Sequence, residues 1–196
     1  MRRWYLAVAA LALGGAGILA EEHVGVPGSN VHYPTPIVRE IEGQNVKMVL
    51  TGTALRKKLV FNVYAIASYV QEGVSVRSAA ELVAVNCPKQ LHLVMERNVS
   101  GNDMAKAFKE AIRLNYSETS FQREINTLSE FLSRHTTQPG DHVFLTYVPN
   151  VGLDVTLVGK AAVRIENVAF ARALWEIYLG RNNLGETIKR GLTSRL

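Results

Sequence analysis

An arginine and a tyrosine beside an apolar run are the side chains in this sequence best suited to hold a small anion. Arg56 precedes the run Leu59–Val70, which is rich in β-branched and aromatic residues and carries Tyr64. Because Arg56 and Tyr64 are an even number of residues apart, they would face the same side of one regular strand. A guanidinium can bond two oxygens at once, so the pair predicts a site for a carboxylate, an enolate or a phenolate at the mouth of an apolar pocket. The alternative is a surface arginine beside Lys57 and Lys58, with the tyrosine as core filler.

No other pattern in the sequence indicates catalysis or a cofactor. There is no G-x-S-x-G elbow, no phosphate-binding P-loop and no dinucleotide-binding glycine fingerprint. The five histidines lack metal-ligand spacing, so no metal site is predicted. The formal charge of +5 includes Arg2 and Arg3, and the densest basic run is shorter than a nucleic-acid patch. We therefore predict neither a cofactor nor a nucleic-acid partner.

Residues 1–20 have the pattern of a secretory signal peptide. Arg2 and Arg3 supply a positive start, Trp4–Leu19 carries no charge, and Ala20 is a small residue at a possible cleavage point. The apolar stretch is shorter than the roughly 20 residues of a membrane span. We expect a cleaved signal and a periplasmic or secreted protein. An uncleaved anchor is the alternative, and it would be the only membrane contact that this sequence predicts.

The rest of the chain divides into an arm and a domain. Residues 21–37 hold three prolines and no apolar period, which predicts an irregular N-terminal arm. From residue 38 onward the hydrophobic pattern is regular, with no repeat and no linker. We therefore expect residues 38–196 to form one domain.

Strand patterns dominate the first part of this domain. Alternation predicts a strand at Val46–Thr51, and Thr51-Gly52-Thr53 indicates a break. The composition of Leu59–Val70 predicts one long strand. Tyr69 would face away from Tyr64 on that strand, because the two are an odd number of residues apart.

Helix and strand periodicities then follow in turn. Helices are predicted after the caps Ser100 and Ser120, at Asn167–Gly180 and at Glu186–Leu192, and strands at Leu91–Met95, Val143–Val148, Leu153–Leu157 and Ala161–Ile165. This order of strands, helices, strands and helices is typical of an α+β fold. It predicts an antiparallel sheet that helices cover mainly on one face.

Three blocks of the sequence resemble the chalcone isomerase family. Gly52-x-x-x-Arg56, followed by Val63-Tyr64-Ala65-Ile66-x-x-Tyr69, resembles the family's first block. Ser100–Leu114 resembles its central helix, with Lys106 where that helix carries a lysine, and Glu166–Gly180 resembles its C-terminal helix. The resemblance covers residues 38–196 and looks closest to exported bacterial chalcone isomerase-like proteins. It implies a large antiparallel sheet packed against a layer of helices, with a ligand cleft between them.

The resemblance implies two kinds of function. In the plant enzymes, which close a chalcone to a flavanone, the arginine that Arg56 matches stabilises the developing oxyanion. In fatty-acid-binding relatives, the same arginine and the tyrosine matched by Tyr64 hold the carboxylate of an acyl chain. The enzymes have a threonine at the position of Tyr64 and a serine or threonine where Ile177 stands. Asp103 and Glu110 replace their helix tyrosine and asparagine, so most of the polar catalytic site is missing.

Three hypotheses follow. The first is an exported, non-catalytic chalcone isomerase-like protein that binds a small apolar anion, a fatty acid or a flavonoid-like molecule, through Arg56, Tyr64 and Lys106. It requires an open apolar tunnel that ends at Arg56. The second is an isomerase or intramolecular lyase that acts on an enone with Arg56 as catalytic residue, and it requires polar helix side chains near Arg56. The third is an envelope interaction module without a small ligand, in which Arg56 pairs with an acid and the cleft is filled by Phe108, Ile112, Leu174 and Trp175.

Overall fold

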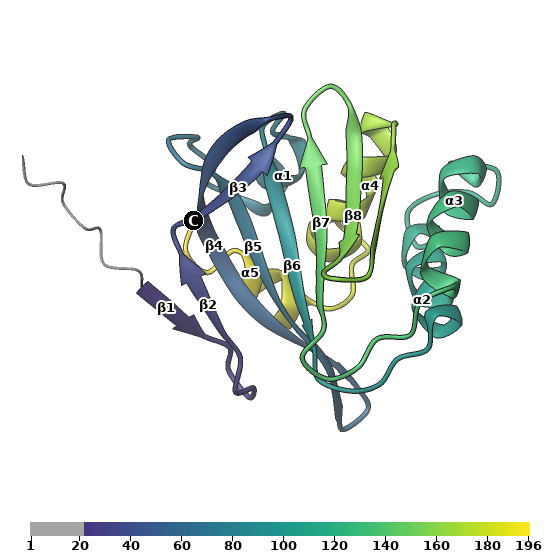
Figure 1. Ribbon diagram of the computed structural model, residues 1–196. Coiled ribbons are helices and arrows are strands. Elements are labelled where there is room, and N and C mark those ends of the chain that lie inside the picture. Colours follow the sequence, from purple (N-terminus) through teal and green to yellow (C-terminus); the bar gives the residue numbers. More distant parts are fainter. Residues whose placement is uncertain (1–21) are drawn as a thin grey trace, which may run out of the picture.

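A seven-stranded antiparallel sheet forms the centre of the protein (Figure 1). The computed structural model describes residues 22–196, so the predicted signal peptide lies outside the described residues. Each strand pairs with the next along the chain, in the order β3-β4-β5-β6-β7-β8-β9. The strands are β3 (Ile37–Ile41), β4 (Gln44–Lys58), β5 (Phe61–Gln71), β6 (Lys89–Met95), β7 (His142–Val148), β8 (Gly152–Leu157) and β9 (Ala161–Ile165). The predicted α+β class with an antiparallel sheet is confirmed.

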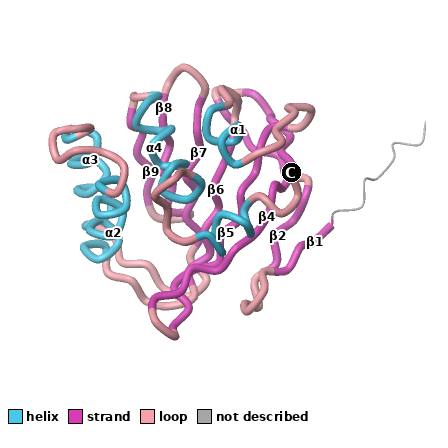
Figure 2. The backbone as a smooth tube through the Cα atoms, turned by 180° about the vertical axis from the view of Figure 1, so that it is seen from behind, coloured by secondary structure: helices cyan, strands magenta, loops and turns pink. Residues whose placement is uncertain are grey.

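Helices cover one face of this sheet. They are α1 (Ala79–Ala84), α2 (Gly101–Arg113), α3 (Gln122–Ser133), α4 (Val168–Leu179) and α5 (Glu186–Leu192). Figure 2 shows α1, α4 and α5 in front of the sheet, with α2 and α3 beside them. The predicted helices are present, but the N-cap of α3 is Phe121 rather than the predicted Ser120, and no side chain caps this helix. Helix α1 is an addition, because six residues are too few to give a helical period.

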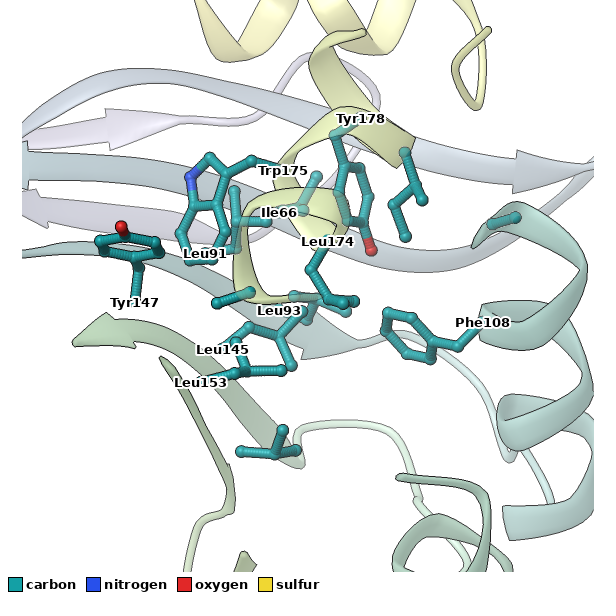
Figure 3. Close-up of a cluster of buried hydrophobic side chains, with 14 of the residues drawn as sticks. Ile66, Leu91, Leu93, Phe108, Leu145, Tyr147, Leu153, Leu174, Trp175 and Tyr178 are labelled. Carbon is teal, nitrogen blue, oxygen red and sulfur yellow. The ribbon is translucent and has the colours of Figure 1, made fainter. Parts of the chain in front are cut away.

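The main core lies between α4 and the inner face of the sheet. Trp175 and Leu174 of α4 are fully buried, and Figure 3 shows them beside leucines of β6, β7 and β8. Phe108 reaches this cluster from α2 (Figure 3) and is also almost fully buried. Burying such large apolar side chains is the main stabilising contribution to a fold of this kind.

The outer face of the sheet is partly covered by an N-terminal ribbon. The irregular arm predicted for residues 21–37 is instead a ribbon of two antiparallel strands, β1 (Glu22–Gly25) and β2 (His32–Thr35). Tyr33 of this ribbon is fully buried, and Tyr69 of β5 donates a hydrogen bond to the carbonyl of Pro34 at 2.8 Å. Tertiary contacts therefore order this segment despite its prolines, and it belongs to the domain.

The predicted break at Thr51-Gly52-Thr53 is wrong, because β4 continues through it with a bulge between Leu50 and Gly52. Gly52 has a φ of 153°, and a Cβ there would collide with the backbone oxygen of Gly191 in α5. Glycine at this position therefore serves close packing of a helix on a continuous strand. The long hairpin that results places Arg56 on β4 rather than on the strand of Tyr64.

A buried lysine closes the end of α1. Lys89 is fully buried, and its ammonium donates hydrogen bonds to the carbonyls of Leu82, Val83 and Val85 at 2.8, 2.8 and 3.0 Å. Burial lowers the pKa of this ammonium, whereas three acceptors favour the charged form, since a neutral amine has only two hydrogens. Lys89 thus supplies the donors that the carbonyls at the helix end lack.

A pair of histidines lies at the edge of the outer-face cluster. His92 is nearly buried, and its Nε2 lies 2.7 Å from Nδ1 of the exposed His142. Burial, with further contributions from His142 and Arg39, lowers the pKa of His92 to about 3. The folded protein therefore holds His92 neutral at pH values at which a free histidine is charged.

Candidate ligand-binding cleft

A cavity of about 300 Å³ lies between the β4–β5 hairpin, α2 and the C-terminal end of α4. Its apolar lining residues are Val63, Val99, Met104, Ala107, Phe108, Ala111, Leu114, Ile177 and Leu184, and its polar ones are Arg56, Lys58, Tyr64, Asp103, Glu110 and Tyr178. Concave, mostly apolar sites with a few convergent polar groups are typical of small-molecule binding. The cavity lies where the sequence resemblance implied a cleft, between sheet and helices.

Arg56 is held at this cavity by the loop between α4 and α5. Its Nη1 donates to the carbonyl of Leu184 at 3.2 Å. Leu184 is fixed in turn by a bond from its amide to the carbonyl of Ile177 at 2.9 Å. Asn183 stabilises the same loop, since it donates to the carbonyl of Gly180 at 2.9 Å. One guanidinium hydrogen is thus used for positioning, and the others are left to bind a ligand.

Tyr64 lies directly opposite Arg56 on the neighbouring strand. Residues paired across antiparallel strands lie on the same face of a sheet, so the two side chains share the cavity. The prediction that they face the same side is confirmed, although through strand pairing rather than through spacing along one strand. Tyr69 packs in the outer-face cluster, whereas Tyr64 packs against the inner core, so the predicted opposite orientation of the two tyrosines is also confirmed.

A second tyrosine completes a pair of hydroxyls beside the arginine. The Tyr64 and Tyr178 hydroxyl oxygens are 3.1 Å apart. Burial raises the pKa of both hydroxyls, although the positive charge of Arg56 acts in the opposite direction. Both groups are therefore neutral at physiological pH. Two neutral hydroxyls carry two hydrogens and only one lies between the two oxygens, so the pair has a second hydrogen to donate to a ligand.

Two carboxylates line the cavity without pairing with the arginine. Among residues 22–196, no acid forms a salt bridge with Arg56. Asp103 accepts a hydrogen bond from the Ser100 hydroxyl at 2.6 Å, and Glu110 lies 3.9 Å from the ammonium of Lys106. Both acids are exposed, so water and these partners screen them. The positive charge of Arg56 is therefore available to an anion.

Lys106 is the candidate that the structure does not bring to the cavity. Its side chain is 74% exposed and pairs with Glu110 on the surface of α2. Met104, Phe108 and Ala111 form the stripe of α2 that lines the cavity. Lys106 is two residues beyond Met104, which places it on the far side of a helix with 3.6 residues per turn. The expectation that Lys106 binds the ligand is not supported by this geometry.

Tyr178 is the site residue that sequence reasoning missed. The pattern of α4 assigned it to the apolar stripe with Leu174 and Ile177, and it is indeed fully buried. Its ring packs in the core while its hydroxyl reaches Tyr64, and Figure 3 shows the ring beside Leu174. The signal in the sequence was a phenol in a stripe of purely aliphatic and aromatic residues, since a buried tyrosine hydroxyl usually has a partner.

The arrangement is suited to binding rather than to metal chemistry. Its donors are the Arg56 guanidinium, the Lys58 ammonium and the Tyr64–Tyr178 hydroxyl pair, beside nine apolar lining residues. Within the described part of the chain, no three His, Cys, Asp or Glu side chains gather in a way that could hold a metal ion.

Comparison with known proteins identifies the family. The family model described as chalcone isomerase-like matches residues 31–193. The chain belongs to the chalcone isomerase-like family. Among solved structures, a fatty-acid binding protein from Arabidopsis thaliana aligns with a TM-score of 0.65 at 16% identity, over 88% of this chain and 96% of the plant chain. At that identity the likeness shows the shared chalcone isomerase-like fold. No curated protein matches the sequence.

The family assignment confirms the resemblance predicted from three sequence blocks. It also extends the matched region N-terminally to residue 31, which agrees with the position of β2 in the domain. None of the helices described between residues 22 and 196 is sufficiently long and apolar to cross a bilayer.

Proposed function

We propose that this chalcone isomerase-like protein binds a small apolar molecule with an anionic head, such as a fatty acid, without catalysing its conversion. The observation that carries the proposal is Arg56, a guanidinium without an acidic partner among the described residues, in the lining of a mostly apolar cavity. An arginine in such a place strongly favours a carboxylate, because charge-assisted hydrogen bonds are strengthened where water is scarce. A fatty-acid binding protein with the same fold supports this ligand class.

The Tyr64–Tyr178 hydroxyl pair offers a second hydrogen-bond donor for the head group of the ligand. Arg56 and the Tyr64–Tyr178 pair line the same cavity, so the spare hydroxyl hydrogen and the remaining guanidinium hydrogens are available to one ligand. A carboxylate has two oxygens, so one can accept from the guanidinium and the other from a hydroxyl. The acyl chain would then run along Met104, Phe108 and Ala111 of α2.

The size of the cavity limits the length of the ligand. An engineered cavity of about 150 Å³ in another protein holds benzene, which has six non-hydrogen atoms. The cavity here is about 300 Å³, so it holds about a dozen such atoms on the same scale. That corresponds to a fatty acid of about ten carbons, or to the head and first part of a longer one.

Export is a second part of this proposal. Residues 1–20 carry the features of a signal peptide, so we propose that the mature protein works in the periplasm or outside the cell. N-terminal sequencing of the protein from its own host would test this. A mature chain that begins near Glu21 supports export, whereas an intact Met1 contradicts a cleaved signal.

The isomerase alternative retains one supporting observation, the Tyr178 hydroxyl that α4 brings to the cavity that Arg56 also lines. Against it, the sequence resemblance implies that Ile177 replaces a serine or threonine of the enzymes, and an isoleucine cannot form a hydrogen bond with a water or a substrate oxygen. The interaction-module alternative required an acid paired with Arg56 and a cleft filled by Phe108, Ile112, Leu174 and Trp175. No acid among residues 22–196 forms a salt bridge with Arg56, and a cavity of about 300 Å³ remains although these four side chains are buried, which favours the binding proposal.

Calorimetric titration with decanoate and with 1-decanol tests the proposal. The two ligands share the apolar chain and differ in head charge, so Arg56→Gln should weaken decanoate binding about 10- to 100-fold and leave decanol binding within about twofold. Arg123→Gln on the exposed side of α3 is the matched control and should change neither ligand. Native mass spectrometry of the protein from its own host should also detect a bound acid.

Three results would contradict the proposal. Equal decanoate affinity in Arg56→Gln and in the unchanged protein would mean that Arg56 does not hold the head group. Failure of both ligands to bind the unchanged protein, together with an empty native mass spectrum, would favour the interaction module. Cyclisation of a chalcone, followed by absorbance and lost in Arg56→Gln, would favour the isomerase.

A further inference from the structure

The tip of the β4–β5 hairpin exposes three large apolar side chains in a row. Leu59, Val60 and Phe61 are 89%, 81% and 60% exposed. The ribbon and the tube views both show this hairpin projecting beyond the rest of the sheet (Figures 1 and 2). Contiguous exposed apolar side chains of this size typically mark an interaction site.

The backbone conformation of the turn does not explain why large apolar residues stand at the tip. Lys58 pairs with Phe61, so Leu59 and Val60 form a tight turn, and Leu59 has a φ of 55°. Positive φ is costly for leucine and is normally left to glycine or asparagine. Within residues 22–196, the other hairpin turns of this sheet place Glu42 and Gly43, Asn150, and Gly159 at positive φ. Only the β4–β5 turn places an aliphatic side chain there, at a backbone cost.

Positive charge surrounds the apolar tip. Lys57 and Lys58 precede it, and the guanidinium of Arg97 lies 5.6 Å from the centre of the Phe61 ring. Across the described residues, none of these three cations forms a salt bridge. The neighbouring acid, Glu96, accepts a hydrogen bond from Asn62 at 2.7 Å. The tip therefore presents apolar side chains at its end and unpaired cations behind them.

We propose that the β4–β5 tip docks on an anionic lipid surface. Leu59, Val60 and Phe61 would enter the boundary between head groups and acyl chains, while Lys57, Lys58 and Arg97 would remain at the level of the phosphates. Apolar insertion and attraction of basic side chains to anionic lipid are the two contributions that hold peripheral proteins on membranes. The sequence predicts membrane contact only through residues 1–20, because its pattern assigns Leu59, Val60 and Phe61 to the start of the predicted strand Leu59–Val70, whereas β5 begins at Phe61.

Docking in this way would bring the cleft close to the bilayer. Lys58 lines the cavity and also adjoins the tip. An apolar molecule could then pass between membrane and cavity over a short distance. The docking itself does not depend on what the cavity binds, so the two proposals can fail separately.

Vesicle binding tests the docking. The protein, as its host processes it, is sedimented with vesicles of phosphatidylglycerol and phosphatidylcholine or of phosphatidylcholine alone. We expect binding to the anionic vesicles that falls at least tenfold in Leu59→Ser/Val60→Ser, because large apolar side chains are lost from the interface. Lys57→Gln/Lys58→Gln should reduce binding by a factor of about 25, since each cation near the surface strengthens it about fivefold.

Matched variants separate the tip from general surface effects. Val158→Ser changes an exposed apolar residue in the β8–β9 turn, and Lys109→Gln/Arg123→Gln removes two charges elsewhere. Both should bind like the unchanged protein. Because every variant has the same N-terminus, any membrane affinity of that segment contributes equally to all of them.

A fluorescent tip provides a readout that the N-terminus cannot produce. The fluorescence of a tryptophan at position 61 is obtained by subtracting the emission of the unchanged protein from that of Phe61→Trp. On anionic vesicles this difference should shift to the blue, and brominated acyl chains should quench it, because the tip enters the apolar part of the bilayer. If this difference is neither shifted nor quenched, the proposal is overturned even if the protein sediments. Equal binding to neutral vesicles would overturn the role of the cations. Dimerisation in solution that Leu59→Ser/Val60→Ser abolishes, without vesicle binding, would show that the tip contacts a second copy instead.

Discussion

Ala111→Leu tests whether the cavity measures the length of an acyl chain. Ala111 lies on α2, is 3% exposed and lines the cavity. Leucine there adds three carbon atoms that point into the space a ligand chain would occupy. If the cavity holds about ten ligand carbons, the substitution should leave room for about seven.

The expected magnitude follows from the burial of methylene groups. Each buried CH₂ contributes about 0.8 kcal/mol, so a ligand that loses three of them from the cavity loses about 2.4 kcal/mol, or about 60-fold in affinity. Decanoate should therefore bind Ala111→Leu about 60-fold more weakly. Hexanoate, which never reaches the filled part, should bind within about twofold of its affinity for the unchanged protein.

Titration calorimetry over a series of even-numbered acids from hexanoate to tetradecanoate measures this. Ala84→Leu adds the same carbons at an exposed position of α1 and is the matched control. Thermal unfolding of each variant checks that α2 has kept its place. Filling a cavity normally stabilises a fold, so Ala111→Leu should unfold at the same temperature or higher.

The pattern of losses decides the outcome. A uniform loss of affinity for all acids would mean that leucine displaced α2 or the head-group site, so that the cavity does not measure chain length. Unchanged decanoate binding would mean that the acyl chain lies elsewhere. Either result would refute the assignment of the chain to the α2 side of the cleft.

Three further outcomes are expected. Tyr178→Phe should weaken decanoate binding about fivefold, the value of one hydrogen bond, and leave decanol binding unchanged, as measured by the same titration. Lys89→Met should lower the free energy of unfolding by about 4 kcal/mol in urea, because three carbonyls at the end of α1 lose a buried charged donor. Burial lowers the pKa of His92 in the folded protein to about 3, so the unfolded chain binds a proton at a higher pH than the folded protein does. The free energy of unfolding of the unchanged protein should therefore fall by about 2 kcal/mol between pH 8 and pH 5, and His92→Gln should remove this loss.

Each of these has a control and a contradicting result. Tyr147→Phe removes a hydroxyl bonded to Asn86 away from the cleft and should not alter binding. Lys109→Met replaces an exposed lysine and should cost well under 1 kcal/mol, whereas an equally small cost for Lys89→Met would show that its desolvation cancels its hydrogen bonds. His32→Gln at an exposed site should keep the acid sensitivity, and a His92→Gln protein that loses the same stability at pH 5 would contradict the role of His92.

Local patterns were sufficient for most elements and for two site residues. Met104, Phe108 and Ile112 recur at helical spacing, so α2 and its buried face could be predicted. The N-terminal ribbon could not, because its order comes from burial of Tyr33 and from the bond between Tyr69 and Pro34. From the sequence, Gly52 predicts a break, because glycine weakens strands. The structure instead requires glycine there because α5, more than a hundred residues later, packs against the strand at this point.

The sequence by itself determined which groups are available for chemistry: one arginine and one tyrosine beside an apolar run, without a metal or nucleotide motif. Their type and periodicity are properties of neighbouring residues. The tertiary structure decided how they are used. It placed Arg56 across from Tyr64 and brought in Tyr178, which is 114 residues from Tyr64 in the sequence. It also bonded Arg56 to the carbonyl of Leu184, 128 residues away, and left Lys106 on the surface outside the cavity. It also left the apolar tip in solvent. These outcomes depend on long-range packing, which no local period encodes.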